Sequence, residues 1–389
     1  MADKTNKRYP VTMVLSRCDQ TGMTINTFDL VKALKRYQDK IDIKLIIGHN
    51  PGEDDISDGL FERFKALGLP ITTYYPAKVL SRKSIFYKLK SSISFIRALR
   101  EAKGVIHMQS PYMTWAPWLL GKKFISTFHT TALQPCFYYK NATHLIAISK
   151  ETKEYAISVF GYNEKDITIV HHGVDSKFAK RIREEEKIQI KDRLGLPKDK
   201  IIITLVGTIE PRKGQDILIK AVMLLPPEIR RRIHILLLGS DNHPEQTNQK
   251  WLDKIIEEEG AREIISIFPY QDPLDFYHIS DIFVLPSWKE GFPLVTIEAL
   301  LSGCLTIRSD AEGAHEQIID GATGYIFPKG DFERLSQIIE MLVRNPKLLA
   351  EIRKVGQEYA MQHFISDEMA KNTLRVYDDF IQNFNIEHK

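Results

Sequence analysis

The chain has 389 residues, which is too long for one ordinary hydrophobic core, so we expect two domains. Its 43% hydrophobic and 27% charged residues are typical of a soluble globular protein, and its net charge of +4 suits an anionic substrate or membrane surface without requiring nucleic acid. No apolar run approaches the roughly 20 residues that span a bilayer, and the N-terminus has no apolar signal region, so we expect a cytoplasmic protein.

Several kinds of site lack their sequence signature. The cysteines, Cys18, Cys136 and Cys304, are far apart and form no CxxC motif, which indicates a reducing compartment and no zinc site. No DxD motif follows a predicted strand, so we expect no catalytic metal. P-loop and GxSxG motifs are also absent from the sequence.

Short β-branched runs alternate with amphipathic segments along the whole chain. The predicted strands are 11–15, 41–47, 71–75, 105–108, 124–128, 144–148 and 167–170, then 201–206, 233–238, 264–268, 282–285 and 305–307. The predicted helices include 27–37, 215–225, 249–259 and 332–344. This alternation predicts an α/β fold of parallel sheets with helices on both faces.

A polar interval divides the strands into two groups. It covers 176–200, includes the charge run 180–187, and places the linker near 173–195. We therefore predict two doubly wound, Rossmann-like domains, 1–180 and 181–363. Ligands bind beyond the carboxyl ends of the strands in such sheets, so two of them facing each other would form a cleft suited to a ligand.

The first predicted strand ends in a turn at 16–23 that carries one glycine, Gly22. A dinucleotide fingerprint needs the pattern GxGxxG, which this turn lacks. Gly22 still allows the backbone to approach a phosphate or an acceptor.

Segment 81–103 is basic and amphipathic. Its apolar residues follow helical spacing, at Ile85, Leu89, Ile93, Ile96 and Leu99, and basic residues surround them. Two interpretations stay open: a helix that lies on anionic lipid, or a helix packed on the protein with a solvated basic face.

His129 follows the predicted strand 124–128. A histidine at a strand end can bond a sugar hydroxyl or transfer a proton, and it can equally cap an element or fill the core. His171 and His172 lie near the predicted linker, where we favour a structural role.

The segment 206–214 follows the first strand of the second half. Gly207 and Gly214 permit close backbone approach, while Arg212 and Lys213 supply positive charge that can hold a diphosphate. By itself this segment also fits a solvated basic turn. It gains weight from the loop at Glu290, which follows another strand of the same predicted sheet.

The segment 286–303 is the most informative part of the sequence. It runs from a buried strand through a glycine turn into an apolar helix, an arrangement whose free N–H groups bind anions. Glu290 and Glu298 flank this turn. A favourable interaction with the positive N-terminal end of the helix dipole would explain only one of the two carboxylates. Glu298 falls inside the helix, where a buried carboxylate needs hydroxyl or N–H donors.

These residues resemble the donor-site signature of the retaining glycosyltransferases of the GT-B fold, the glycosyl transferases group 1 family. Seven residues separate Glu290 from Glu298, and Gly313-Ala-His-Glu316 and the segment 320–328 follow. The resemblance is strong over 200–330 and reaches the first half through Thr127-Phe-His129 and Gly173-Val-Asp175. It implies that a last helix, within 364–389, crosses back to the first domain.

The resemblance also implies roles for single residues. Glu298 would bind the ribose of the donor nucleotide, Glu290 the transferred sugar, and His129 the donor sugar at the reaction centre. Arg212 and Lys213 would neutralise the leaving diphosphate. The implied donor-binding set is completed by Gly22, Gly207, Tyr270, Gly291, Phe292, Pro293 and Leu294, with the amides of Phe292 and Leu294 receiving the phosphates.

The implied reaction moves a sugar from a UDP- or GDP-sugar to a glycan, lipid-linked or other hydroxyl acceptor, with no metal or other cofactor and no nucleic-acid partner. Segment 81–103 would then place the protein on the inner face of the membrane. A sugar-nucleotide epimerase, a phosphorylase and a catalytically silent subunit of a glycan-assembly complex are the alternatives.

The chain departs from the family pattern at three places. Thr208-Ile209 stands where many members have Arg-Leu, Pro293 stands where many have glycine, and Gly22 lacks a paired glycine. Arg212 would replace the lost arginine, and Leu294 would carry more of the phosphate contact because proline has no N–H.

Overall fold

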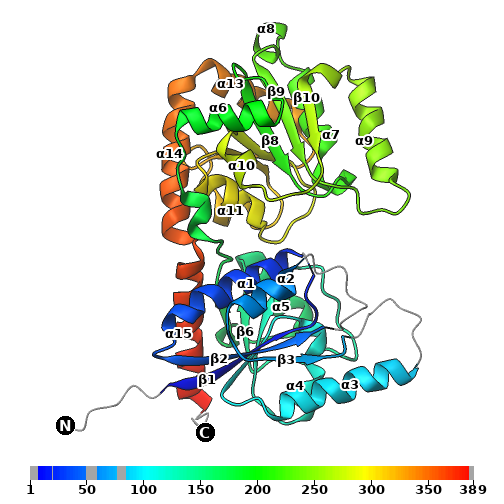
Figure 1. The fold of residues 1–389 in the computed structure, drawn as a ribbon, viewed down its shortest axis with the longest axis vertical. Coiled ribbons are helices and arrows are strands. Elements are labelled where there is room, and N and C mark those ends of the chain that lie inside the picture. The colour runs from blue at the N-terminus through cyan, green and yellow to red at the C-terminus, as the bar shows by residue number, and fades with distance from the viewer. Residues whose placement is uncertain (1–7, 20, 50–58, 77–84, 385–389) are drawn as a thin grey trace, which may run out of the picture. The chain divides into compact units, whose positions relative to one another are not determined.

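The computed structural model describes residues 8–19, 21–49, 59–76 and 85–384 (Figure 1). The chain forms two compact units, Met1–Gly173 with Ser366–Lys389, and Val174–Ile365. The first unit thus gives way to the second at Gly173, ahead of the predicted boundary at 180/181. The last helix of the chain lies in the first unit.

The first unit is built on a parallel sheet of order β3-β2-β1-β4-β5-β6-β7. Its strands are β1 (Tyr9–Leu15), β2 (Ile41–Gly48), β3 (Ile71–Tyr74), β4 (Val105–Met108), β5 (Ile125–Phe128), β6 (His144–Ala147) and β7 (Ile167–Ile169). Its helices are α1 (Gly22–Leu34), α2 (Leu60–Ala66), α3 (Ile85–Arg100), α4 (Trp115–Leu119), α5 (Lys150–Phe160) and α15 (Ser366–Phe384).

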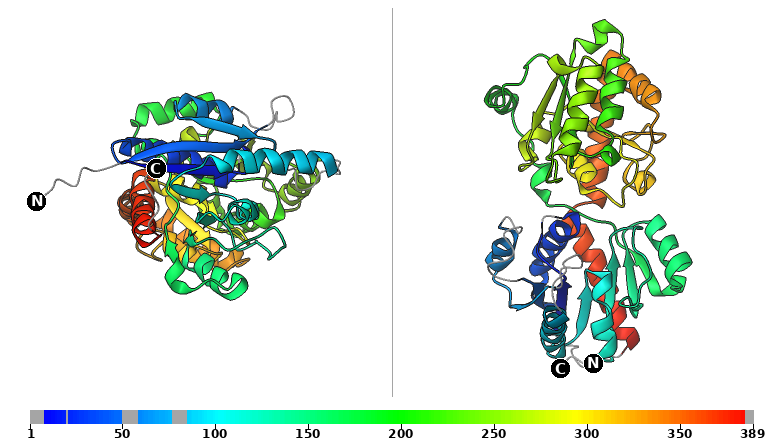
Figure 2. Two further views of the ribbon diagram at one scale, coloured as in Figure 1. Left: turned by 90° about the horizontal axis from the view of Figure 1, so that it is seen from below. Right: turned by 90° about the vertical axis from the view of Figure 1, so that its right-hand side faces the viewer.

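Helices cover both faces of this sheet, as a doubly wound fold requires (Figure 2). Met13 and Leu15 of β1 pack in one cluster with residues of α1 and α15. Val14, which points to the opposite face, packs with Phe95 of α3 and Ala116 of α4. Because successive strand residues alternate between faces, a strand buried on both sides reads as one continuous apolar run.

The second unit has a parallel sheet of order β10-β9-β8-β11-β12-β13. Its strands are β8 (Ile201–Val206), β9 (Ile233–Leu238), β10 (Ile265–Phe268), β11 (Ile282–Leu285), β12 (Leu305–Ser309) and β13 (Tyr325–Phe327). Its helices are α6 (Glu184–Arg193), α7 (Gln215–Met223), α8 (Pro227–Arg230), α9 (Thr247–Glu258), α10 (Leu274–His278), α11 (Leu294–Leu301), α12 (Ala314–Gln317), α13 (Phe332–Arg344) and α14 (Pro346–His363).

The architecture confirms the predicted pair of doubly wound α/β domains. The predicted strands all occur, with ends that shift by a residue or two. β13 was not predicted from the sequence. It has only three residues, two of which are partly buried, so the sequence shows no clear apolar run there.

Candidate functional site

The second unit brings two glycine-containing loops together at the middle of its sheet. β8 lies between β9 and β11, so the strand order reverses there, and ligands of doubly wound sheets bind at such points. Gly214 has a φ of +73°, and a Cβ on it would lie 2.3 Å from the carbonyl oxygen of Pro286. Only glycine allows this close approach between the loops after β8 and β11.

A buried ion pair joins these two loops. The Nζ atom of Lys213 lies 2.6 Å from Oε1 of Glu290, and their side chains are only 13% and 9% exposed. Arg212 lies at the rim, with one guanidinium nitrogen 3.9 Å from the same oxygen and hydrogen bonds to the carbonyl of Lys289 and the carboxylate of Glu210. The structure therefore gathers three of the predicted residues into one cluster.

The charge state of Glu290 depends on this cluster. Burial alone would raise the pKa of its carboxyl, but the Lys213 ammonium and its hydrogen bond outweigh burial and hold that pKa below its ordinary value. The side chain is thus a carboxylate at neutral pH. Lys213 also packs over Gly207, where a Cβ would lie 3.6 Å from its side-chain carbons.

The turn that leads into α11 is tightly packed. Gly313 has a φ of +75°, and a Cβ there would lie 2.5 Å from the carbonyl oxygen of Gly291. Phe292 is buried and its ring lies edge-on to Phe364, at 5.8 Å between centroids. α11 begins at Leu294, directly after its N-cap residue Pro293, whose side chain makes no capping hydrogen bond to the first turn. Its amide groups therefore remain suited to an anion.

Glu312 is a member of this site that sequence reasoning missed. Its carboxylate accepts a hydrogen bond from the backbone N–H of Glu290, at 3.1 Å. No spacing rule points to it, because the contact depends on the loop after β12 folding back onto the loop after β11.

Glu298 lies on α11 and is 9% exposed. The hydroxyl of Tyr277, a fully buried side chain of α10, donates a hydrogen bond to its Oε2 at 2.9 Å. Burial, followed by the nearby Glu298 charge, raises the pKa of Tyr277, so this hydroxyl stays a donor. Tyr277 supplies one of the donors that a buried carboxylate needs, and it too was not foreseen. Tyr270 is 49% exposed after β10, and its N–H donates to Oγ of Ser240 at 3.0 Å.

In the first unit, His129 takes part in a hydrogen-bonded network. Its Nε2 lies 2.9 Å from Oε1 of Gln109, and its Nδ1 lies 3.0 Å from Nε2 of His172. Burial first, and then the neighbouring histidines, lower its pKa well below the ordinary value. Its ring is therefore neutral at neutral pH. A direct hydrogen bond from the ring to a sugar would require the ring to give up its hydrogen bond to Gln109 or to His172.

The network continues to the last helix. Gln109 contacts His107, whose ring nitrogens lie 2.7 Å from the hydroxyls of Tyr377 on α15 and of Thr127 on β5. His107 is fully buried, and burial lowers its pKa to about 3. The position of His129 thus depends on a polar chain that reaches α15.

This network predicts an acid-sensitive first unit. The unfolded chain protonates His107 below its ordinary pKa of 6.5, whereas the folded unit does so only near pH 3. The free energy of unfolding is therefore highest above pH 6.5 and falls toward pH 3, by about 1.4 kcal/mol per pH unit for this residue. Amide exchange in β4 and β5 measures this slope. The His107→Asn variant should lose the contribution of this residue to the pH dependence of the unfolding free energy. An unchanged pH dependence in the variant would contradict the role given to His107.

Gly22 opens α1, where it is exposed and a Cβ would meet no atom within 4 Å. The N-cap residue, Thr21, bonds to Asp19 rather than to the helix amides. Gly22 is therefore accessible, and its contact with a phosphate or an acceptor stays a prediction.

Helix α3 exposes an apolar stripe. Phe86, Leu89 and Ile93 are 78%, 58% and 50% exposed, and Lys90 and Arg97 lie on the same side of the helix by spacing. The buried side instead carries Phe95 and Leu99. The predicted stripe through Leu89 and Ile93 is thus not packed on the protein. Residues 81–84 of the predicted segment lie outside the described residues.

Both halves of the chain match models of known protein families. Residues 186–359 match the family model described as glycosyl transferases group 1, and residues 20–178 match Glycosyltransferase Family 4. The D-inositol 3-phosphate glycosyltransferase of Streptomyces bingchenggensis is 29% identical over 250 residues, covering 62% of this chain and 54% of that protein. The chain spans about half the length of the curated relatives it matches.

Two solved structures share the fold. A glycosyltransferase from Rickettsia africae has a TM-score of 0.81 at 18% identity, covering 97% of this chain and 99% of that one. HepE from Anabaena, solved in complex with UDP, has a TM-score of 0.79 at 17% identity, covering 95% and 100%. Residues 186–359 therefore match the glycosyl transferases group 1 family, and the chain as a whole has the fold of these GT-B structures.

Proposed function

We propose that this chain is a retaining, metal-independent glycosyltransferase that moves a sugar from a nucleoside-diphosphate sugar to a hydroxyl acceptor. The observation that carries the proposal is the buried Lys213–Glu290 pair next to the uncapped first turn of α11. HepE, a structural neighbour, has been solved with UDP and with UDP-glucose, which favours UDP as the nucleotide.

Departure of the diphosphate is the step in which negative charge develops. Lys213, Arg212 and the first amides of α11 supply positive potential for it, an electrostatic role of the oxyanion-hole type. Glu290 would accept hydrogen bonds from the transferred sugar, and Glu298 from the ribose. Because retention places the acceptor on the face that the phosphate leaves, the leaving phosphate would accept the acceptor's proton. Glu290 then has no need to act as a covalent nucleophile.

A thermal-shift screen against UDP- and GDP-sugars tests the donor. A ligand that binds only the native state raises the unfolding temperature, so the preferred donor should give the largest shift. The anomeric configuration of the product then tests retention. Turnover without an acceptor would instead identify an epimerase, a requirement for inorganic phosphate would identify a phosphorylase, and no binding of any nucleotide sugar would contradict the proposal.

We also propose that α3 binds an anionic membrane surface. None of the described helices is long and apolar enough to cross a membrane. The exposed stripe of Phe86, Leu89 and Ile93 could instead enter the interfacial region, while Lys90 and Arg97 face anionic headgroups. Such a surface would bring the protein to a lipid-linked acceptor.

Changing Phe86, Leu89 and Ile93 to Ser should weaken binding to vesicles of phosphatidylcholine and phosphatidylglycerol by at least about tenfold, because each buried CH₂ contributes about 0.8 kcal/mol. Sedimentation with vesicles measures this. Ile157→Ser and Val159→Ser on α5, which also remove exposed apolar side chains, are the matched controls. If the wild type ignores vesicles, the membrane proposal is wrong.

A further inference from the structure

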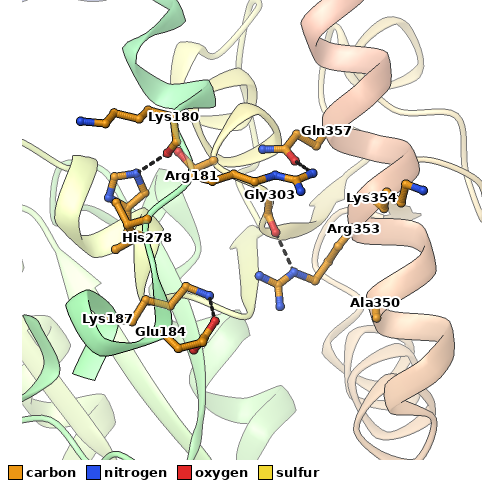
Figure 3. A pocket seen from close by; sticks show the side chains of 12 residues that line it. Lys180, Arg181, Glu184, Lys187, His278, Gly303, Ala350, Arg353, Lys354 and Gln357 are labelled. Carbon is orange, nitrogen blue, oxygen red and sulfur yellow. Dashed lines mark hydrogen bonds and ion pairs between the residues drawn. The ribbon is translucent and has the colours of Figure 1, made fainter. Parts of the chain in front are cut away.

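The second unit contains a cavity that shares no lining residue with the Lys213–Glu290 cluster. Its volume is about 320 Å³, near the lower end of the range for small-molecule sites. The segment at 180–187, the end of α10, the end of α11 and helix α14 line it (Figure 3).

Positive charge dominates the lining. Lys180, Arg181, Lys187, Arg353 and Lys354 line the cavity, and Glu184 is the acidic side chain among the lining residues. Lys187 of α6 and Arg353 of α14 point toward each other across the cavity in Figure 3. Such convergent charge in a concave surface attracts anions.

Protein groups neutralise this charge only in part. Lys187 pairs with Glu184 at 2.5 Å, but the Glu184 side chain is 75% exposed, so an incoming anion can displace it. Arg353 donates to the carbonyl of Gly303 at 2.6 Å and has a longer contact, 3.5 Å, with Asp281.

The remaining cations contribute further. Arg181 donates to the neutral Oε1 of Gln357 at 3.0 Å, and Lys354 is 4.0 Å from Glu358. Lys180 has no carboxylate within ion-pair distance in the part of the chain that the structure describes. Most of these cations therefore retain hydrogen-bonding capacity for an anion with several oxygens.

Two buried polar atoms of the lining residues add a second observation. The hydroxyl of Ser302 and Nδ1 of His278 have no hydrogen-bond partner among the described residues. His278 is 8% exposed, and its Nε2 bonds to the carbonyl of Lys180 at 3.1 Å. Buried polar atoms without partners cost free energy that a bound ligand recovers.

We propose that this cavity binds a small phosphate-bearing anion between Lys187, Arg353 and Arg181. Phosphate suits the site because its oxygens can accept from the ammonium and both guanidinium groups at once. The anion would also connect α6 with α14. Helix α6 follows Gly173, where the chain leaves the first unit, and α14 precedes Ser366, where the chain returns to it. The source is either a soluble phosphate compound or a lipid headgroup.

Titration of the full chain with inorganic phosphate tests the site, with the ring resonances of His278 as the local reporter. Burial first, and then the charges of Lys187 and Lys180, lower the pKa of His278, while the Lys180 carbonyl and Asp275 oppose them. A bound anion would raise that pKa. The Arg181→Gln/Lys187→Gln double variant should weaken the phosphate response about tenfold or more.

Two controls isolate this cavity. Lys191→Gln removes a charge from α6 outside the lining, and Lys213→Gln removes the predicted diphosphate ligand; both should leave the His278 response unchanged. A cooperative thermal unfolding transition shows that each variant folds, including Lys213→Gln, which is expected to be less stable. If His278 ignores phosphate in the wild type, or responds equally in the double variant, the proposal is overturned.

Vesicles with and without phosphatidylglycerol distinguish the two sources in a protein that carries the Ser changes on α3, which weaken vesicle binding through that helix. If this protein still binds phosphatidylglycerol vesicles, and the double variant loses that binding together with the phosphate response, the ligand is a lipid headgroup. If this protein responds to phosphate but does not bind the vesicles, the ligand is a soluble phosphate compound.

Discussion

Replacing Lys213 with Met should lower kcat/KM by about 10²- to 10³-fold, the loss typical of removing one electrostatic stabiliser of a transition state. The ammonium lies 2.6 Å from Glu290 in a setting where both side chains are nearly buried. The variant loses the positive charge that stabilises the leaving diphosphate, and it also leaves a buried carboxylate without its cation. Steady-state kinetics with the donor identified by the thermal-shift screen measure the change.

The same variant should lose stability, by about 3 to 5 kcal/mol, because the partner of a buried charge is gone. The sign of its pH dependence follows from Glu290. In the wild type the lowered pKa adds stability above the ordinary pKa of a glutamate, and this stability is lost as the pH falls through the lowered value. In the variant, burial raises that pKa. The stability difference between the two proteins should therefore be largest at neutral pH and shrink in acid.

Two variants make this prediction specific. Lys220→Met removes a lysine from α7, outside the loop, and should retain activity and stability. The double variant Lys213→Met/Glu290→Gln should recover stability without recovering activity, because it has no buried charge and no cation for the diphosphate. Near-normal kcat/KM in Lys213→Met would remove Lys213 from the mechanism.

Replacing Glu298 with Ala should weaken donor binding by about 10- to 100-fold, which corresponds to the loss of charge-assisted hydrogen bonds to the ribose. Isothermal titration calorimetry with the nucleotide sugar measures the affinity. The carboxylate is 9% exposed on α11 and already accepts a hydrogen bond from Tyr277, so its orientation is held before any ligand binds.

Tyr277→Phe separates the two roles of this contact. It removes the hydroxyl that orients Glu298 but retains the carboxylate, so donor affinity should fall only a few-fold. Glu298→Gln retains an acceptor for Tyr277 but loses the negative charge. Its donor affinity should therefore lie between those of Tyr277→Phe and Glu298→Ala. Unchanged donor affinity in Glu298→Ala would show that this carboxylate does not bind the donor.

Much of the fold could be read from the sequence because its signals are local. β11 is a continuous apolar run, and β8 and β9 are apolar except for Thr204 and His234, as expected of parallel strands that are buried on both faces. Glu298 could be singled out for the same reason, since a carboxylate in an apolar helix is costly without a partner, and Glu290 could be singled out by its place at the glycine turn before that helix. Helix α3 shows the limit: its apolar spacing was clear, but only the packing of Phe95 and Leu99 decided that Leu89 and Ile93 lie exposed.

The sequence by itself determined the two α/β domains, the strand ends that carry the candidate residues, and the glycine turn between two carboxylates. Only the tertiary structure decided their partners. Lys213 forms an ion pair with Glu290, Tyr277 donates a hydrogen bond to Glu298, and Glu312 accepts one from the backbone N–H of Glu290. These contacts join elements far apart in the chain, through strand order and close glycine packing. Hydrophobic periodicity reports which side of an element is buried, but it carries no information about which distant side chain it will meet.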